Sequence, residues 1–290
     1  MLRSLKRNLR LDALLVNLSL LLIVLICLLP FLWSVSSSLK GREELFQTLP
    51  TLFPQHPILG NYEFIFTRRD MSMIPINMLN SFKVSFLAVL IQTSLATMAG
   101  YAFARLDFKG RDLLFYTLIL LIFIPRAGGL MAVYELMDAL GLRNSHLGLA
   151  LLFSSAMSTA VFIMKQNFLS VPRELEESAI IEGANTWQVF LHVAVPLAKG
   201  GMVVVALFEF LYVWGEYLIT RTLIDFPELD TLSVAVSKIT GWAALFTSSA
   251  FSTYGAEAAA HVVAMVPVIL IFIVMQKWFI RGLTDGILKM

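Results

Sequence analysis

The chain has 290 residues, of which 58% are hydrophobic and only 14% are charged. An ordinary soluble domain has roughly 25% charged residues, so this composition, with a mean hydropathy of +0.78, excludes one. It also excludes a disordered chain, a collagen, a coiled coil and a disulfide scaffold. The net charge is +2 and the basic residues are dispersed, which argues against nucleic acid as a partner. The composition therefore predicts an integral membrane protein.

Four uncharged runs are long enough to cross the ~30 Å hydrocarbon core of a bilayer, and two further apolar runs contain one charge each. We expect an all-α integral membrane fold with six transmembrane helices and little or no strand. A short segment, 1–12, precedes a transmembrane domain that covers 13–290. The uncharged run 239–256 is too rich in Ser, Thr and Gly for a span, so a loop or an interfacial helix is expected there. The spans are predicted at about 13–39, 84–104, 113–134, 144–164, 200–222 and 258–276.

Lys and Arg are distributed unequally between the two sides of this six-helix arrangement. With the N-terminus inside, the inner segments carry 13 basic residues in 69 positions, and the outer segments carry 9 in 107. Because cytoplasmic loops are enriched in Lys and Arg, this predicts that both termini are cytoplasmic. The segment 165–199 then becomes the largest cytoplasmic loop.

Motifs for catalysis and energy conversion are absent from the sequence. It has no phosphate-binding loop, no H-E-x-x-H, no G-x-S-x-G, and one cysteine, Cys27. The four histidines lie in four different segments, so no spacing brings them together on a metal ion. We therefore expect no catalytic residue, no metal site and no energy source within this chain.

The segment 165–199 has the pattern of a helix–turn–helix. Pro172 suits a first helical turn, and the acidic residues after it are favourable near the positive end of a helix dipole. Gly183 and Asn185 interrupt this helix, and Asn185 with Gln188 has the sequence of a capping box. On physical grounds alone, the pattern also fits a membrane-surface hairpin that only links two spans. The second helix is predicted from an apolar stripe that a proline ends or kinks: Trp187, Phe190, Leu191, Ala194, Val195 and Pro196.

The same segment contains a spaced motif. E-S-A at Glu177–Ala179 is followed by three residues, Gly183, nine residues and V-A-V-P ending at Pro196. This resembles the EAA loop of binding-protein-dependent ABC importer permeases: E-A-A, three residues, G, nine residues, I-x-L-P. The departures are conservative, since Ser178 replaces the first alanine and valines replace Ile and Leu.

Four other stretches resemble the carbohydrate branch of that family, which includes the maltose permease. Their sequences are YAFARLDFKGR at 101–111, LGLRNS at 140–145, WGEY at 214–217 and GLTDGILK at 282–289. Gly215 stands where the family has Asn, and the second proline expected soon after Pro125 is missing. These departures concern contacts with the solute and its pathway, not membership of the family.

The resemblance implies a multi-pass subunit of an importer in the bacterial inner membrane. Its partners would be a second permease, a dimer of ATP-binding subunits that bind ATP and Mg, and an external solute-binding protein. In the family the first loop helix sits in a cleft of the ATPase. Glu177 would make a charge-assisted contact there, unless it is only a charge stabilised by the helix dipole. The residues expected to couple to the ATPase are Glu176, Glu177, Ser178, Ala179, Glu182, Gly183, Ala184 and Pro196.

A cluster of aromatic and acidic residues near the fifth span is the candidate lining of the solute pathway: Glu209, Tyr212, Trp214 and Glu216. Charges inside spans are costly and are functional candidates, and aromatic residues beside polar ones are typical of sugar sites. The alternative is an interhelical hydrogen bond or an aromatic belt at the membrane interface. The outer loops 40–83 and 216–257 would either dock the binding protein or form solvated surface.

The sequence therefore predicts a non-catalytic permease subunit of an ATP-driven importer for a sugar or oligosaccharide. An importer of a non-sugar polar solute, such as glycerol phosphate, is an alternative. An ion-coupled secondary transporter is disfavoured because the apolar runs contain one glutamate, Glu209, and the sequence has no convincing internal repeat. A membrane-embedded enzyme is disfavoured by the missing catalytic motifs.

Overall fold

The computed structural model describes residues 2–47, 49, 51–67, 73–125, 128–244 and 251–284. Their regular structure is helical, with no strand among these residues, as the sequence predicted. The chain forms two compact units. Unit 1 contains Met1–Met73 and Val236–Val263, and unit 2 contains Ile74–Ala235 and Ala264–Met290.

Three described helices are long and apolar enough to cross a membrane, and they coincide with the predicted first, second and sixth spans. Two bent helix pairs raise the number to five if each pair is one span. The predicted third span, 113–134, is not one continuous helix, since α5 (Arg111–Leu120) and the 3₁₀ turn η1 (Leu121–Phe123) precede a break. Arg126 lies outside the described residues. The three long segments are Leu14–Ser38 in α1 (Leu2–Ser38), Ile74–Arg105 (α4) and Thr253–Trp278 in α15 (Thr253–Thr284).

Unit 1 is organised around a buried asparagine. It contains α1, α2 (Arg42–Leu45), α3 (Gly60–Thr67) and parts of α14 (Leu232–Ala244) and α15. The Asn61 amide donates to the carbonyls of Ser38 and Lys40 at 2.9 and 3.0 Å, and its oxygen accepts from the Ser252 N–H at 2.8 Å. One side chain therefore satisfies the backbone where α1 ends and α15 is about to begin.

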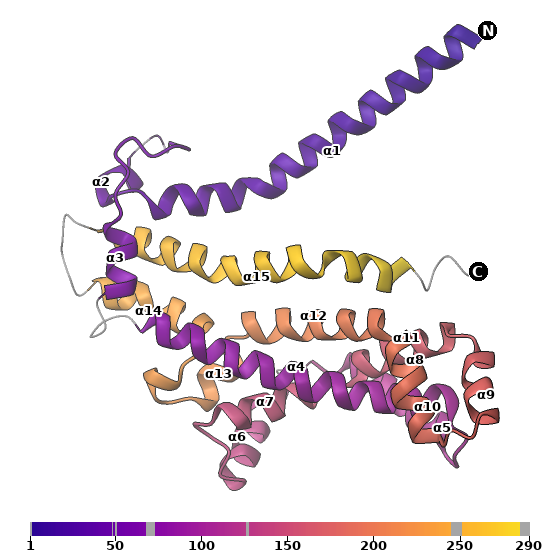
Figure 1. Ribbon diagram of the computed structural model, residues 1–290. Helices are drawn as coiled ribbons and strands as arrows, with labels where there is room; N and C mark the ends of the chain where they lie inside the picture. The colour runs from indigo at the N-terminus through magenta and orange to yellow at the C-terminus, as the bar shows by residue number, and fades with distance from the viewer. Residues whose placement is uncertain are drawn as a thin grey trace. The chain divides into compact units, whose positions relative to one another are not determined.

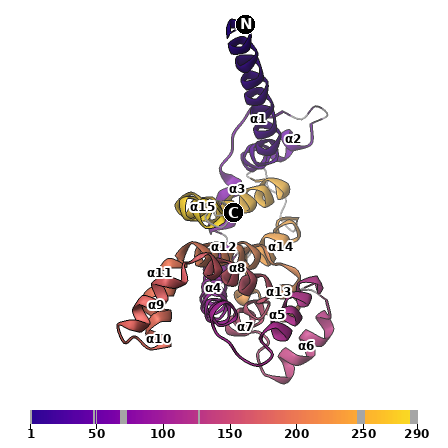
Figure 2. The same ribbon diagram turned by 90° about the vertical axis from the view of Figure 1, so that its right-hand side faces the viewer.

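The long helix α4 is the centre of unit 2. It packs against α7 (His146–Ser154), α8 (Ser158–Ser170) and α12 (Lys199–Gly215) (Figures 1 and 2). A Cβ placed on Gly100 would lie 2.5 Å from the Met164 Cβ, so only glycine permits this close approach of α4 and α8. Gly100 therefore sets the distance between α4 and α8.

Several short helices of unit 2 lie toward the two ends of α4 (Figure 1). Near its C-terminal end, which we call the α9 end, are α9 (Arg173–Ile181), α10 (Thr186–Val189), a π-helical turn η2 (Phe190–Ala194) and α11 (Val195–Leu197). Near its N-terminal end, which we call the α6 end, are α6 (Leu130–Ala139), α13 (Leu218–Leu223) and the 3₁₀ turn η3 (Pro227–Leu229). Each end has its own buried apolar cluster.

Candidate functional site

The predicted helix–turn–helix is present at the α9 end. Gly183 adopts a left-handed φ of +92°, and its N–H donates to the Ile180 carbonyl at 2.9 Å. The Ala184 N–H donates to the Ala179 carbonyl at 3.0 Å, which completes a Schellman end to α9. The capping box is also confirmed: Asn185 Oδ1 accepts from the Gln188 N–H at 2.9 Å, and Gln188 Oε1 accepts from the Asn185 N–H at 2.8 Å. The turn is therefore fixed by local hydrogen bonds at both helix ends.

Two consecutive glutamates of α9 point in different directions. Glu176 is the buried residue of this helix, whereas Glu177 is exposed. Arg105 Nε, at the end of α4, donates to Glu176 Oε1 at 2.7 Å, and the Tyr101 hydroxyl donates to Glu176 Oε2 at 3.2 Å. Arg105 Nη2 also donates to the Val171 carbonyl at the end of α8, at 2.6 Å. We call Tyr101, Arg105, Val171 and Glu176 the α9 network.

The other coupling candidates lie on or near the surface around this turn. Ser178 and Glu182 are exposed, Ala179 and Ala184 are half-buried, and the Ser178 hydroxyl donates to the Glu174 carbonyl at 2.7 Å. Pro196 is exposed in α11, just before the chain bends by 73° into α12. Large apolar side chains are also exposed here, with Ile181 at 87%. We call this face the α9–α10 surface, defined by Leu175, Glu177, Ile180, Ile181, Glu182 and Trp187.

Two of the four pathway candidates line cavities inside unit 2. Tyr212 lines a cavity of about 320 Å³ together with Ser155, Ser158 and Thr159. Glu209, which is 2% exposed, lines a smaller cavity of about 140 Å³ with Gln92 and Thr159. Ala156 and Thr159 border both cavities. The two candidates therefore lie along adjacent internal spaces.

The other two candidates make contacts that stabilise the fold. Trp214 is buried, donates from Nε1 to the Ala264 carbonyl at 3.1 Å, and stacks on Phe210. The Glu216 carboxylate accepts from the backbone N–H of Ile219 and of Thr220 at 2.7 and 2.9 Å, and from the Thr220 hydroxyl at 2.9 Å. Glu216 thus satisfies the free N–H groups at the start of α13. The bond of Trp214 joins α12 to α15 and is an interhelical hydrogen bond, whereas the bonds of Glu216 are local to the start of α13.

Both cavities border a break in the membrane-spanning part of unit 2. The axes of α7 and α8 differ by 54° across residues 155–157. Gln92 of α4 donates from Nε2 to the Ala156 carbonyl at 3.2 Å, which satisfies one of the backbone groups that the break releases. Irregular backbone at membrane depth is tolerated where it is buried in protein or lines a cavity. Residues 155–157 include no Pro or Gly, so the usual signals for a helix break are missing from the sequence here.

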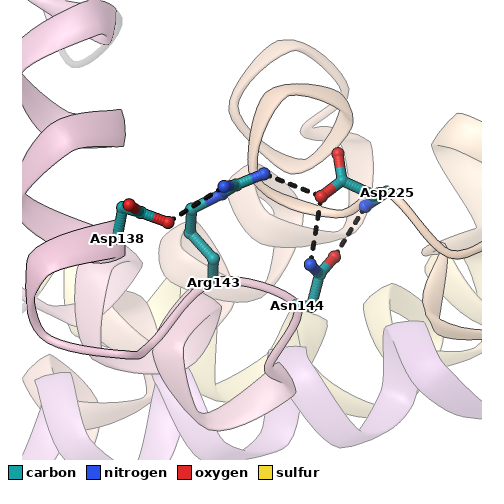
Figure 3. Close-up of polar contacts among 4 residues, drawn as sticks. All are labelled: Asp138, Arg143, Asn144 and Asp225. Carbon is teal, nitrogen blue, oxygen red and sulfur yellow. Dashed lines mark hydrogen bonds and ion pairs between the residues drawn. The ribbon is translucent and has the colours of Figure 1, made fainter.

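A second arginine network lies at the α6 end (Figure 3). Arg143 Nη1 donates to Asp138 Oδ1 at 2.9 Å, and Nη2 donates to Asp225 Oδ2 at 2.7 Å. Asn144, at a φ of 52°, donates to Asp225 Oδ2 at 3.0 Å and accepts from the Asp225 N–H at 2.7 Å. The hydrogen bond from Arg143 to Asp138 raises the pKa of this guanidinium above its ordinary value. We call these four residues the α6 network.

Neither arginine network was predicted from the sequence. The available signals were the polar residues Tyr101 and Arg105 at the end of a span, and the pair Arg143 and Asn144 in a short turn. Asp138 is five positions from Arg143, but the other partners are 66 to 82 positions away, so only the tertiary fold completes the networks. Among the residues that the structure describes, no group of His, Cys, Asp and Glu could hold a metal ion.

Comparisons with known proteins place the chain in a family. A model of the binding-protein-dependent transport system inner membrane component matches residues 92–285. The galactooligosaccharides transport system permease protein GanQ of Bacillus subtilis is 31% identical, over 89% of this chain and 88% of that protein. The trehalose transport system permease protein SugB of Mycobacterium tuberculosis is 32% identical, over 92% and 94%.

A solved structure supports the same fold. One chain of a bacterial ABC transporter involved in the import of the acidic polysaccharide alginate superimposes with a TM-score of 0.82, at 21% identity, over 93% of this chain and 97% of that chain. Together with the matched family model and the permease relatives, this confirms the predicted recognition. The chain belongs to the inner membrane components of binding-protein-dependent ABC transport systems, and it is a permease subunit.

Proposed function

We propose that this permease belongs to an ATP-driven importer that carries a sugar or short oligosaccharide delivered by an external solute-binding protein. The observation that carries the proposal is the set of relatives, at least 30% identical over most of the chain, whose names specify galactooligosaccharides or trehalose. The family itself depends on a binding protein. This chain contributes a path through the membrane, and ATP hydrolysis is left to partner subunits that bind ATP and Mg.

The proposed arrangement in the bacterial inner membrane has six spans, with both termini and the segment 165–199 in the cytoplasm. The three long helices, the bent pair α7 and α8, and α12 would supply five of these spans, with α10 and α11 on the cytoplasmic side of α12. The remaining one would include α5 and η1, which are apolar but are followed by a break. The excess of Lys and Arg in the inner segments sets the orientation. A second permease would complete the path, since one six-helix chain forms a single wall.

The α9–α10 surface is the proposed docking site for the ATP-binding subunits. Ile181 and Trp187 are 87% and 56% exposed, and in the proposed topology they lie outside the membrane, where lipid does not cover them. Glu177 and Glu182 border them and remain exposed to a partner. Apolar anchors surrounded by charges are the composition of a protein interface. The exposure of these side chains is an observation of the structure. It does not depend on the spacing of the motif, although both concern the same segment.

The two internal cavities are the proposed part of the solute pathway in this chain. Their described linings combine aromatic and apolar side chains with hydroxyl, amide and carboxylate groups, which suits a ring that carries several hydroxyls.

The test is reconstitution of the chain with the second permease, the ATP-binding subunit and the binding protein encoded with it. Uptake of tritiated trehalose, maltotriose, galactobiose and glycerol 3-phosphate is measured with and without ATP. We expect ATP-dependent uptake of one of the sugars by the full complex and none by this chain alone. Uptake by the chain alone under an ion gradient would show a secondary transporter. ATP-dependent uptake of glycerol 3-phosphate alone would contradict the sugar assignment.

A further inference from the structure

One side chain of α9, Glu176, makes the hydrogen bonds that join this helix to α4. Of the residues in α9, Glu176 is the one that is buried, and its carboxylate contacts two residues in the last turns of α4. The ion pair with Arg105 has side-chain exposures of only 6% and 9%. A helix whose other residues face solvent or its own turn is therefore joined to α4 by a buried polar contact.

The partners of Glu176 are themselves held in place. Tyr101 packs edge-on against Phe168 of α8 and lies 4.9 Å from the Phe190 ring of η2. The Arg105 guanidinium also donates to the Val171 carbonyl, so it caps the C-terminal end of α8 while it binds α9. A planar guanidinium fixed at two positions leaves the carboxylate little freedom of orientation.

We propose that Glu176, Arg105 and Tyr101 lock α9 to α4, so that a displacement of the α9–α10 surface moves α4 as part of the same rigid body. The proposal rests on the proposed docking of ATP-binding subunits, because they would supply the displacement. Glu176 and Arg105 are positioning residues in this scheme, and Glu177 is the neighbouring contact with the partner. Glu176 thus attaches α9 to α4, and Glu177 on the same helix contacts the partner.

The opposite end of α4 is tied to backbone in a similar way. Asn77 and Asn80 each donate to the Asp230 carbonyl, at 2.9 and 3.0 Å. Ser81 Oγ accepts from the Leu232 N–H at 2.7 Å. Because α4 has 32 residues, a rise of ~1.5 Å per residue makes it long enough to join both ends of the bundle. Through these hydrogen bonds, a displacement of α4 would also displace the segment 227–232 at the α6 end.

The test measures distances between spin labels in the full-length permease, in a Cys27→Ser background. One pair, Glu174→Cys with Phe86→Cys, reports on α9 and α4; both side chains are exposed. A reference pair, Phe86→Cys with Phe162→Cys, reports on α4 and α8. Both pairs are measured in the wild-type network, in the double variant E176Q/R105M, and in the control variant E177Q.

Without any partner, we expect the double variant to broaden the α9–α4 distance distribution about twofold, because α9 gains ångström-scale freedom, while the reference pair is unchanged. The control E177Q should leave both pairs narrow. An unchanged α9–α4 distribution would overturn the lock. Broadening of the reference pair as well would also overturn it, because the network would then be a general support of the bundle.

The second arm adds the ATP-binding subunits with Mg-ATP and vanadate. In the wild-type network the α9–α4 distance should stay constant, and in E176Q/R105M it should shift by about 2 Å as α9 follows the partner alone. Equal behaviour of the two proteins would contradict the proposal. If the subunits fail to copurify with the wild type, the proposed docking fails, while the partner-free arm still decides the lock. R105K, which keeps the charge but not the planar guanidinium, should give a distribution between those of the wild type and the double variant.

Discussion

The two arginine networks of unit 2 use the same chemistry in opposite surroundings. At the α9 end, Arg105 and Glu176 are 6% and 9% exposed and join a surface helix to the central one. At the α6 end, Arg143 is 20% exposed and its partners Asp138 and Asp225 are 62% and 53% exposed (Figure 3). Both arginines bind a carboxylate from a segment distant in sequence.

The difference in burial determines what each network contributes. Removal of one member of a buried pair leaves the other charge without compensation in a medium of low polarity, which is costly. Exposed pairs are solvated and screened, so removal of one partner changes little. The α9 network is therefore expected to hold α9 rigidly against α4. The α6 network is expected to add little stability, and its contribution should fall as the salt concentration rises.

The largest expected effect is that of Arg105→Met. This variant leaves Glu176 buried with only the Tyr101 hydroxyl as a partner, and we expect a loss of about 3–5 kcal/mol in the free energy of unfolding. Thermal unfolding of the purified permease in detergent measures it. Addition of Glu176→Gln should recover part of the loss, because the unpaired charge is then removed. Equal stability of the single variant and the wild type would show that the pair is solvated.

Gly183→Ala should have an intermediate effect. A Cβ at this position meets no atom within 4 Å, so the cost comes only from the left-handed φ of +92°. That strain is about 1 kcal/mol, which corresponds to roughly fivefold less ATP-binding subunit in a copurification assay. Gly183→Asn should be milder, because Asn tolerates this conformation. Identical recovery of the subunit with both variants and the wild type would remove the role given to this turn.

Arg143→Gln should have a smaller effect than Arg105→Met. Its partners are exposed, so screening at about 1 M NaCl, where the Debye length is ~3 Å, should remove the difference from the wild type. The loss caused by Arg105→Met should persist in the same salt. Melting curves of both variants at low and high salt measure this contrast. A salt-independent loss at position 143 would mean that the α6 network is buried in the assembled transporter.

Asp138→Asn should have the smallest effect. It removes one of the two carboxylates on Arg143, and the 2.7 Å contact with Asp225 remains. Melting in low salt should differ from the wild type by less than it does for Arg143→Gln. A larger loss of thermal stability would indicate that Arg143 is held mainly by Asp138 and not by Asp225.

The local features of the fold were predictable from the sequence. The three long spans follow from uncharged runs, and the capping box of Asn185 and Gln188 follows from spacing alone. The left-handed Gly183 was predictable for the same reason, since a residue without Cβ stands between two helical patterns. These features depend on contacts within four residues of one another, which a sequence displays directly.

The features that depend on tertiary contacts were not predictable. Polar side chains at a helix surface are expected to face water, yet the fold buries Glu176 because Arg105 and Tyr101 lie opposite it. The break at 155–157 contains no proline or glycine. It persists because Gln92, on a different helix, satisfies the Ala156 carbonyl. Trp214 and Glu216 fit a sugar site by residue type, but their hydrogen bonds to Ala264 and α13 were visible only in the structure.

In the proposed arrangement, the exposed face of the α9 turn binds the ATP-binding subunits while the α9 network holds the turn to α4. Copurification of the ATP-binding subunit with Ile181→Asp, compared with the wild type, tests this docking. Ile181 is 87% exposed, so the substitution leaves the fold of the permease intact. We expect Ile181→Asp to lose the subunit while Arg143→Gln, at the other end of the bundle, retains it. Full recovery of the subunit with Ile181→Asp would show that the subunits do not dock on this surface.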